Sequence, residues 1–145
     1  MRKIRLVLSL VLFLSVSFQA SAQWEWQNSS PQSAFYGAIF FVDSSYGWVT
    51  GYDTESWKGI ITRTTNGGTN WETKFYDDFW LISSIYFVDS LTGWAFGQNN
   101  LDTSVVYGNY IYKSTNGGRN WFRQSVISDK ILWAANFTDA NTGWA

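Results

Sequence analysis

An internal repeat constrains the fold of this chain more than any other feature of its sequence. The segment Phe41–Trp48 reads Phe-Val-Asp-Ser-Ser-Tyr-Gly-Trp, and related segments return at Phe87–Trp94, 46 residues later, and at Phe137–Trp144, a further 50 residues on. A second motif, Thr64–Trp71, follows the first copy and returns as Ser114–Trp121 after 50 residues. Self-similarity at such a period is typical of repeat architectures, propellers among them.

Each repeat is expected to form four short antiparallel strands. Apolar, β-branched and aromatic runs alternate with turn residues, and no helical period follows the first 22 residues. The expected strands are Phe35–Val42, Gly47–Tyr52, Gly59–Thr64 and Trp71–Phe75 in the first repeat, and Ile82–Val88, Trp94–Gly97, Tyr110–Ser114 and Trp121–Val126 in the second. The four extra residues of the second repeat fall between Gly97 and Ile111, which marks a loop. Four-stranded units at this period predict an all-β protein, a β-propeller of antiparallel blades, with a β-sandwich as the alternative.

The repeats amount to two complete blades plus part of a third, at about residues 34–75, 82–126 and 131–145. Residues 24–27 align with the fourth strands and are expected to supply the outer strand of the closing blade. Because propellers typically carry about 4–8 blades, we expect residues 23–145 to be a partial β-propeller, and the chain to be the N-terminal fragment of a longer protein.

The two repeated motifs are interpreted as structural turns. In the first, the Asp89 carboxylate is expected to accept backbone N–H groups, and Gly93 is expected at positive φ. In the second, Trp71 and Trp121 are expected to pack beneath their turns, each burying about 200 Å²; a glycan-stacking role for them stays open. The blade-turn residues are Asp43, Gly47, Trp48, Asp89, Gly93, Trp94, Asp139, Gly143 and Trp144, and those of the second motif are Thr64, Asn66, Gly68, Trp71, Ser114, Asn116, Gly118 and Trp121.

The second motif resembles the Asp-box of bacterial neuraminidase (BNR) repeats, with Asn66 and Asn116 where Asp is commoner. Together with the Phe-Val-Asp…Gly-Trp turn, it makes the chain from about Trp24 to Ala145 similar to the Ycf48/Hcf136-like photosynthesis system II assembly factor family. That resemblance implies a β-propeller that acts as a protein-binding scaffold in the assembly of a complex, in the envelope or photosystem-like, and it does not imply an enzyme.

The first 22 residues read as a signal peptide. Arg2, Lys3 and Arg5 precede the apolar run Leu6–Phe18, and the small-residue pattern Ala20-Ser21-Ala22 follows. The apolar run has 13 residues, whereas a spanning helix needs about 20; a membrane anchor is the alternative. We therefore expect a secreted or periplasmic protein of a bacterial envelope, with no stable membrane insertion after cleavage.

Composition excludes several kinds of chemistry. The chain has 0 Cys and 0 His, which removes thiolate and imidazole nucleophiles, bases and metal ligands. We expect no catalytic residues, no metal and no cofactor. Without residues 1–22 the chain carries 7 basic and 11 acidic residues, a net charge of −4, so nucleic acid is not an expected partner.

The loops after the second and fourth strands of each blade should lie together on one face. Aromatic residues with polar neighbours are typical of recognition surfaces. Trp57 and Tyr107 are expected to be the most exposed, while other rings could instead pack between blades. The candidate binding face comprises Tyr52, Asp53, Trp57, Tyr76, Asp77, Asp78, Trp80, Asp102 and Tyr107.

This face favours a protein-interaction scaffold with a protein partner, and a glycan is possible as a ligand. The alternative is the N-terminal part of a carbohydrate-active propeller enzyme, such as a sialidase or xyloglucanase relative. Such an enzyme would need converging acids. The loop acids Asp53, Glu55, Asp77, Asp78 and Asp102 are interpreted as solvated instead.

Overall fold

In a computed structural model of the chain, the described residues are 33–77, 81–99, 108–128 and 132–145. Ten strands form within them, and none of these residues lies in a helix long and apolar enough to cross a membrane. The strands are β1 Ala34–Phe41, β2 Gly47–Asp53, β3 Gly59–Thr64, β4 Glu72–Asp77, β5 Leu81–Phe87, β6 Gly93–Asn99, β7 Gly108–Ser114, β8 Phe122–Ser128, β9 Asn136–Phe137 and β10 Gly143–Trp144. The expected signal peptide and the expected outer strand at residues 24–27 lie outside the described residues.

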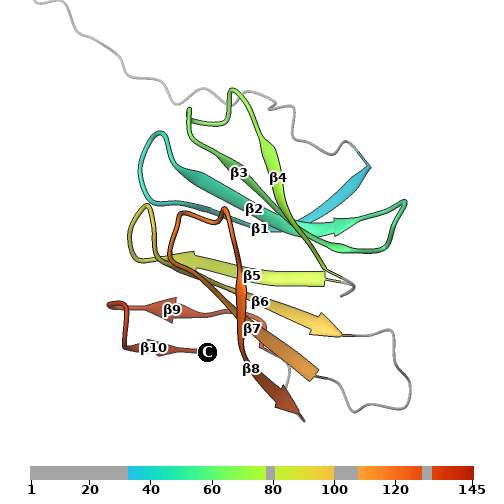
Figure 1. The fold of residues 1–145 in the computed structure, drawn as a ribbon, viewed down its shortest axis with the longest axis vertical. Coiled ribbons are helices and arrows are strands. Elements are labelled where there is room, and N and C mark those ends of the chain that lie inside the picture. The colour runs from blue at the N-terminus through green and yellow to red at the C-terminus, as the bar shows by residue number, and fades with distance from the viewer. Residues whose placement is uncertain (1–32, 78–80, 100–107, 129–131) are drawn as a thin grey trace, which may run out of the picture.

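The strands assemble into two four-stranded antiparallel sheets and the start of a third. The first sheet has the order β1-β2-β3-β4, the second β5-β6-β7-β8, and β9 pairs with β10. Figure 1 shows the two complete sheets packed against each other, with β9 and β10 beyond the second. The prediction of an all-β fold built from four-stranded propeller blades, two complete and one partial, is confirmed.

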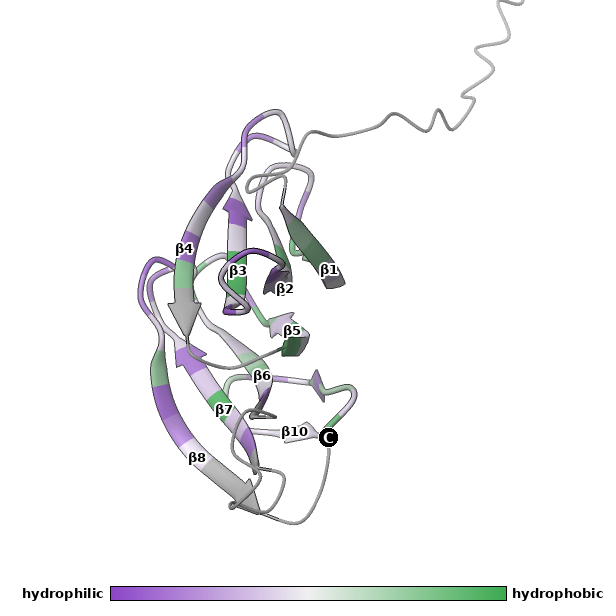
Figure 2. Ribbon diagram, turned by 90° about the vertical axis from the view of Figure 1, so that its right-hand side faces the viewer, coloured by the Kyte–Doolittle hydropathy of each residue, from purple (hydrophilic) through white to green (hydrophobic). Residues whose placement is uncertain are grey.

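The main core lies between the two blades. Strand β5 packs against β1, β2 and β3 of the first blade. Figure 2 shows apolar residues gathered on β1, at one edge of the molecule, and long hydrophilic stretches on β4 and β8 at the opposite edge. The buried cluster at the centre consists of Trp48, Ile61, Ile82, Ile85, Phe87, Ala95 and Tyr112.

The first repeated turn has the same geometry in all three copies. Asp43 Oδ1 accepts the backbone N–H groups of the residues two and three positions later, at 2.7 and 2.8 Å. Asp89 does so at 2.7 and 2.6 Å, and Asp139 at 2.7 and 2.9 Å. Each carboxylate therefore satisfies two backbone donors that have no strand partner at the turn.

The glycine of this turn does not have the expected backbone conformation. The glycines at positive φ are Gly67, Gly68, Gly117 and Gly118, and Gly93 is not among them. Instead, Gly93 lies opposite Phe87 in the β5–β6 register, and a Cβ at Gly93 would come within 2.5 Å of the Phe87 ring. The expectation of positive φ was wrong, because the constraint is a ring lying over the glycine across the two strands.

The second repeated turn is held by side-chain hydrogen bonds. The Thr64 hydroxyl donates to Asn66 Oδ1 at 3.0 Å and accepts the Gly68 N–H at 2.9 Å, while Asn66 Oδ1 accepts the Asn70 N–H at 2.9 Å. The second blade repeats these contacts with distances of 3.1, 2.8 and 3.0 Å. At this turn, backbone N–H groups are thus hydrogen-bonded by the Thr64 hydroxyl and the Asn66 side-chain amide and not by a neighbouring strand.

Candidate functional site

The strand ends that flank the singled-out loops of the first blade lie at one end of its sheet. The register pairs Ala34 with Asp53 and Gly59 with Asp77, so these strand termini share one end of the first sheet. The turns that contain Asn66 and its counterpart in the second blade lie at the opposite end. The loop end of the first blade therefore presents the β2–β3 connection, residues 54–58, without interference from the repeated turns.

Three aromatic rings stack at this loop end. The Phe35 and Tyr52 ring centroids are 5.4 Å apart with 26° between the planes, and those of Tyr52 and Trp57 are 5.8 Å apart with 11° between the planes. Phe35 is 55% exposed and Trp57 is 51% exposed. We call these three residues the aromatic stack. It offers two half-exposed rings around one that is partly buried.

A bulge in β1 sets Phe35 against Tyr52, the inner ring of the stack. The pairing of β1 with β2 shifts register between Tyr36 and Ala38. Phe35 consequently lies directly opposite Tyr52, and cross-strand partners project from the same face of a sheet. Bulges of this kind re-aim side chains near functional sites.

The β2–β3 connection gives the stack its other outer ring, Trp57. The Asp53 N–H donates to the Lys58 carbonyl at 2.8 Å, and the Trp57 N–H donates to the Asp53 carbonyl at 2.8 Å. Trp57 itself sits in the left-handed region with φ of 58°, which is uncommon for a bulky residue. Strain of this type is found where surrounding structure holds a residue in a functional position.

A fixed negative charge lies at the start of the same connection, on Asp53, the residue after Tyr52. Asp53 Oδ1 accepts the Glu55 N–H at 2.8 Å and the Ser56 N–H at 3.4 Å, and the Ser33 hydroxyl donates to it at 3.4 Å. The hydrogen bond from the Glu55 backbone is the largest cause that lowers the pKa of Asp53 below its ordinary value of 3.8. The carboxylate therefore stays ionised across the neutral range.

The structure brings together only part of the predicted binding face. Tyr52, Asp53 and Trp57 are adjacent, and β4 brings the backbone of Tyr76 and Asp77 to the same end of the sheet. The remaining members lie outside the described residues; these are Asp78, Trp80, Asp102 and Tyr107.

Sequence reasoning missed Phe35, which it placed in a strand without a further role. A comparison of the two repeats could have identified it. Leu81 and Gln98 form the pair in the second blade that corresponds to Phe35 and Tyr52 in the first. The architectural residues recur from blade to blade, whereas this pair does not, so an architectural requirement does not account for it.

The site offers the flat apolar faces of the aromatic stack, the Asp53 carboxylate held by hydrogen bonds to its own loop, and the backbone at the ends of the strands. Within the described ranges, no three Asp or Glu side chains gather into a group that could hold a metal ion. Such a combination suits recognition of an apolar or aromatic group with a positive charge next to it, because aromatic faces and carboxylates both attract cations.

Comparisons with known proteins agree with this fold. No family model and no curated protein matches the sequence. Among solved structures, the chain is similar to one titled "YCF48 bound to D1 peptide", with a TM-score of 0.60 and 20% sequence identity. The match covers 86% of this chain and 38% of that one, so the chain spans well under half the length of the protein it matches. The chain therefore has the fold of part of a Ycf48-like β-propeller.

Proposed function

We propose that this chain is a protein-interaction module, secreted or periplasmic, whose loop end in the first blade binds a peptide segment of a partner protein. The observation that carries the proposal is the aromatic stack. Its outer rings are half exposed, Trp57 is held at a strained φ of 58°, and the second blade has no equivalent of the Phe35–Tyr52 pair.

The chemistry of the stack favours a peptide with a basic residue next to an apolar or aromatic one. A ring of the partner can lie against Trp57 or Phe35, and exposed aromatic anchors carry much of the affinity at protein interfaces. The Asp53 carboxylate, ionised and hydrogen-bonded to the loop backbone, would then attract a Lys or Arg of the same peptide. The similar YCF48 structure was solved with a peptide bound, which supports a peptide as the ligand class.

The proposal extends to location and to chemistry. An extracytoplasmic location depends on the basic and apolar composition of residues 1–22. A binding role, and not a hydrolytic one, is supported by the state of the Asp53 carboxylate. Asp53 is committed to hydrogen bonds with its own loop, so it is poorly placed to act as a general acid, which needs a raised pKa.

Peptide binding by defined variants tests the function. Fluorescently labelled peptides that place Arg beside Phe are titrated against the chain, and otherwise identical peptides with Glu in place of Arg provide the comparison. We expect the Arg-Phe peptides to bind and Trp57→Ala to weaken binding about tenfold or more. Asp53→Asn should remove the preference for Arg over Glu, because Asn keeps an oxygen acceptor for the loop and loses the charge.

Trp133→Ala is the matched control. Trp133 is 69% exposed and lies outside the aromatic stack, so its loss should leave binding unchanged. If no peptide of either set binds, or if Trp57→Ala binds as the parent chain does, the proposed face is wrong.

A further inference from the structure

One arginine is buried in the joint between the two complete blades. Arg63 of β3 is 7% exposed and lies opposite Trp48 in the β2–β3 register. Trp48 stacks on Phe87 of the second blade, and cross-strand partners project from the same face of a sheet. Arg63 therefore projects toward the second blade as well. A Cβ on Gly117, in the turn between β7 and β8, would lie 3.7 Å from Arg63 Nη2.

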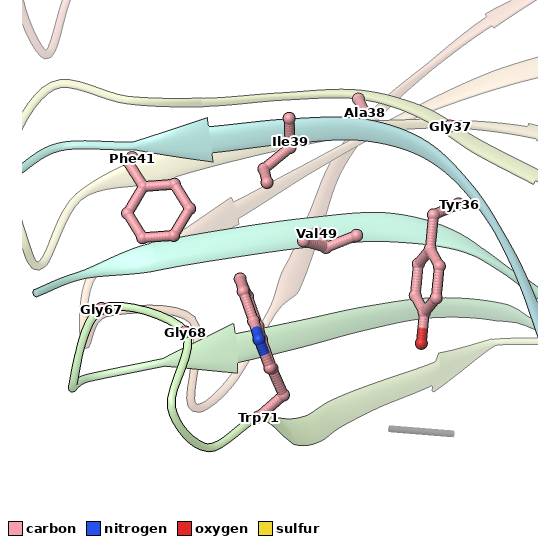
Figure 3. A pocket seen from close by; sticks show the side chains of 9 residues that line it. All are labelled: Tyr36, Gly37, Ala38, Ile39, Phe41, Val49, Gly67, Gly68 and Trp71. Atoms are coloured by element: carbon pink, nitrogen blue, oxygen red, sulfur yellow. The ribbon is translucent and has the colours of Figure 1, made fainter. Parts of the chain in front are cut away.

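The pocket on the opposite face of the first sheet is uncharged. Val49 follows Trp48 on β2, and successive residues of a strand point to opposite faces. Figure 3 shows Val49, Ile39 and Phe41 around a pocket of about 390 Å³ on that face. None of the residues that line it is charged, so the charge of Arg63 belongs to the joint between the blades.

The guanidinium of Arg63 has a donor that the joint does not satisfy. Arg63 Nε is buried and has no hydrogen-bond partner among the described residues. Its Cζ lies 5.9 Å from the centroid of the Tyr46 ring, a cation–π contact that gives the N–H groups no acceptor. Buried polar groups without a partner are uncommon, and a bound ion is one of the reasons for them.

A second arginine adds positive charge from the other blade. Arg119 is exposed and follows Gly117 in the same turn by two residues. Its Nη1 donates to the Asn116 carbonyl at 3.4 Å. Burial is the largest cause that lowers the pKa of Arg63 below its ordinary value, and the charge of Arg119 is the next. The two guanidinium groups therefore act on each other across the joint.

The carboxylate that offsets part of this charge is shared with another cation. Glu72 lies opposite Arg63 in the β3–β4 register, and its negative charge acts to raise the pKa of Arg63. Glu72 also forms an ion pair with Lys74. Arg63, Arg119 and Lys74 thus carry three positive charges against the one negative charge of Glu72.

A small cavity lies next to Arg63. It has a volume of about 110 Å³, and Arg63 and Glu72 form part of its wall. A single water needs about 10–15 Å³ of such volume, so the cavity has room for a group of several heavy atoms. The remaining lining residues come from the β3–β4 turn and its end, and most of them carry a hydroxyl or an amide; they are Thr65, Asn66, Asn70 and Trp71.

We propose that the joint between the two complete blades binds a small oxyanion, which Arg63 contacts in this cavity and to which Arg119 adds attraction from the second blade. Guanidinium groups bind phosphate and carboxylate oxygens through paired N–H donors. A bound oxyanion would give Arg63 an acceptor and would place a negative charge between two positive ones. This site lies at the turn end of the blades, away from the aromatic stack, and is independent of the proposed peptide binding.

Thermal unfolding of the 145-residue chain in increasing concentrations of inorganic phosphate, at constant ionic strength, tests the proposal. The Tm should rise and then level off, because a ligand that binds only the folded chain stabilises it by mass action. Exclusion of phosphate from the protein surface also raises the Tm, but it does so without saturation and equally in every variant. A parallel series in acetate distinguishes the two sources of the oxyanion, since the preferred one reaches half of its effect at the lower concentration.

Arginine variants assign the effect to the joint. Arg63→Gln should weaken phosphate binding about tenfold or more, and Arg119→Gln should weaken it about threefold or more, because it removes charge without a direct contact. Arg123→Gln is the matched control. Arg123 is exposed in the same blade and lies over the Tyr110 ring, 5.4 Å from its centroid, so its loss should leave binding unchanged.

The NMR resonance of the Arg63 Nε–H gives a readout that a purely structural role would not move. It should shift as phosphate is added, with the same half-saturation concentration as the Tm. Trp57→Ala should bind phosphate as the parent chain does, which separates this site from the peptide-binding face.

Three results would overturn the proposal. Neither phosphate nor acetate could give a saturable rise in Tm. The Arg63 resonance could stay in place while phosphate is added. Arg119→Gln could bind as Arg123→Gln does; both residues are exposed, so both variants should fold, and this comparison decides even if Arg63→Gln does not fold.

Discussion

The indole ring of Trp48 lies parallel to the ring of Phe87, with 3.5 Å between their centroids, although the two residues belong to different blades. The indole N–H also reaches the Gly117 carbonyl in the turn between β7 and β8. One side chain therefore packs on a strand and hydrogen-bonds to a turn of its neighbour. Because this contact lies in the central buried cluster, we expect the two complete blades to unfold together.

Trp48→Ala should destabilise the chain by about 3–5 kcal/mol, the usual cost of replacing a fully buried large aromatic residue by alanine. Denaturant unfolding followed by circular dichroism measures the loss. Trp133→Ala removes the same side chain from a site that is 69% exposed, and it should change the unfolding free energy by less than about 0.5 kcal/mol. Similar losses for the two variants would contradict the assigned role of Trp48.

Thr64→Val should destabilise the chain by about 1–3 kcal/mol. Valine has nearly the shape of threonine but leaves the Gly68 N–H, which Thr64 Oγ1 accepts at 2.9 Å in a buried position, without its partner. The neighbouring Thr65 is exposed, so Thr65→Val serves as the matched control and should have little effect. Urea unfolding of both variants tests the prediction, which fails if Thr65→Val costs as much as Thr64→Val.

The repeat made much of this architecture predictable. Turn residues such as Asp89 and Asn116 bond to their own neighbours in the chain, so their roles depend on local sequence alone. The strand boundaries also followed from local patterns. β2, for example, was expected at residues 47–52 and is found at Gly47–Asp53.

Contacts that depend on register could not be predicted in the same way. The partner of Phe35 follows from a bulge between Tyr36 and Ala38. Gly37 lies at that bulge, and a glycine inside a strand pattern indicates a bulge without fixing which residue faces Phe35. The stacking of Trp48 on Phe87 depends on how one blade sits against the next, which a pattern within one repeat does not encode. The candidate site was therefore predicted from Tyr52 and the loop that follows it, and Phe35 of β1 was missed.

Lowering the pH should weaken two turns. The backbone hydrogen bond from Glu55 lowers the pKa of Asp53, and that from Asn141 lowers the pKa of Asp139, each relative to 3.8. Since the folded pKa is the lower one, the stabilisation is fully present above about pH 3.8 and is lost as pH falls through the folded pKa.

Carboxyl titration by NMR measures both pKa values directly, and each should lie below 3.8. Asp139→Asn keeps an oxygen acceptor but has no carboxyl group to titrate. The variant should therefore show a smaller loss of unfolding free energy than the parent chain as pH falls below 3.8. An unchanged acid dependence would mean that this carboxylate contributes nothing to stability.

Substitutions at Gly93 distinguish steric exclusion from backbone conformation. A Cβ there would come within 2.5 Å of the Phe87 ring, so Gly93→Ala should destabilise the chain by about 1–3 kcal/mol. A Cβ at Gly97 would have its nearest neighbour at an ordinary 3.7 Å. Gly97→Ala should therefore be neutral or slightly stabilising, because alanine restricts the unfolded chain more than glycine does.

Gly93→Asn makes the distinction sharp, because the two explanations order the variants oppositely. Asn tolerates positive φ better than Ala does, so a conformational requirement would make Gly93→Asn the milder change. If steric exclusion is the cause, the larger Asn should destabilise the chain more than Ala does. Replacing the Phe87 ring with the Phe87→Leu substitution should then reduce the loss of unfolding free energy caused by Gly93→Ala, as measured in a double-mutant cycle. Thermal unfolding of the four chains of that cycle measures the coupling, and additive effects would show that the Phe87 ring is not what excludes a side chain at Gly93.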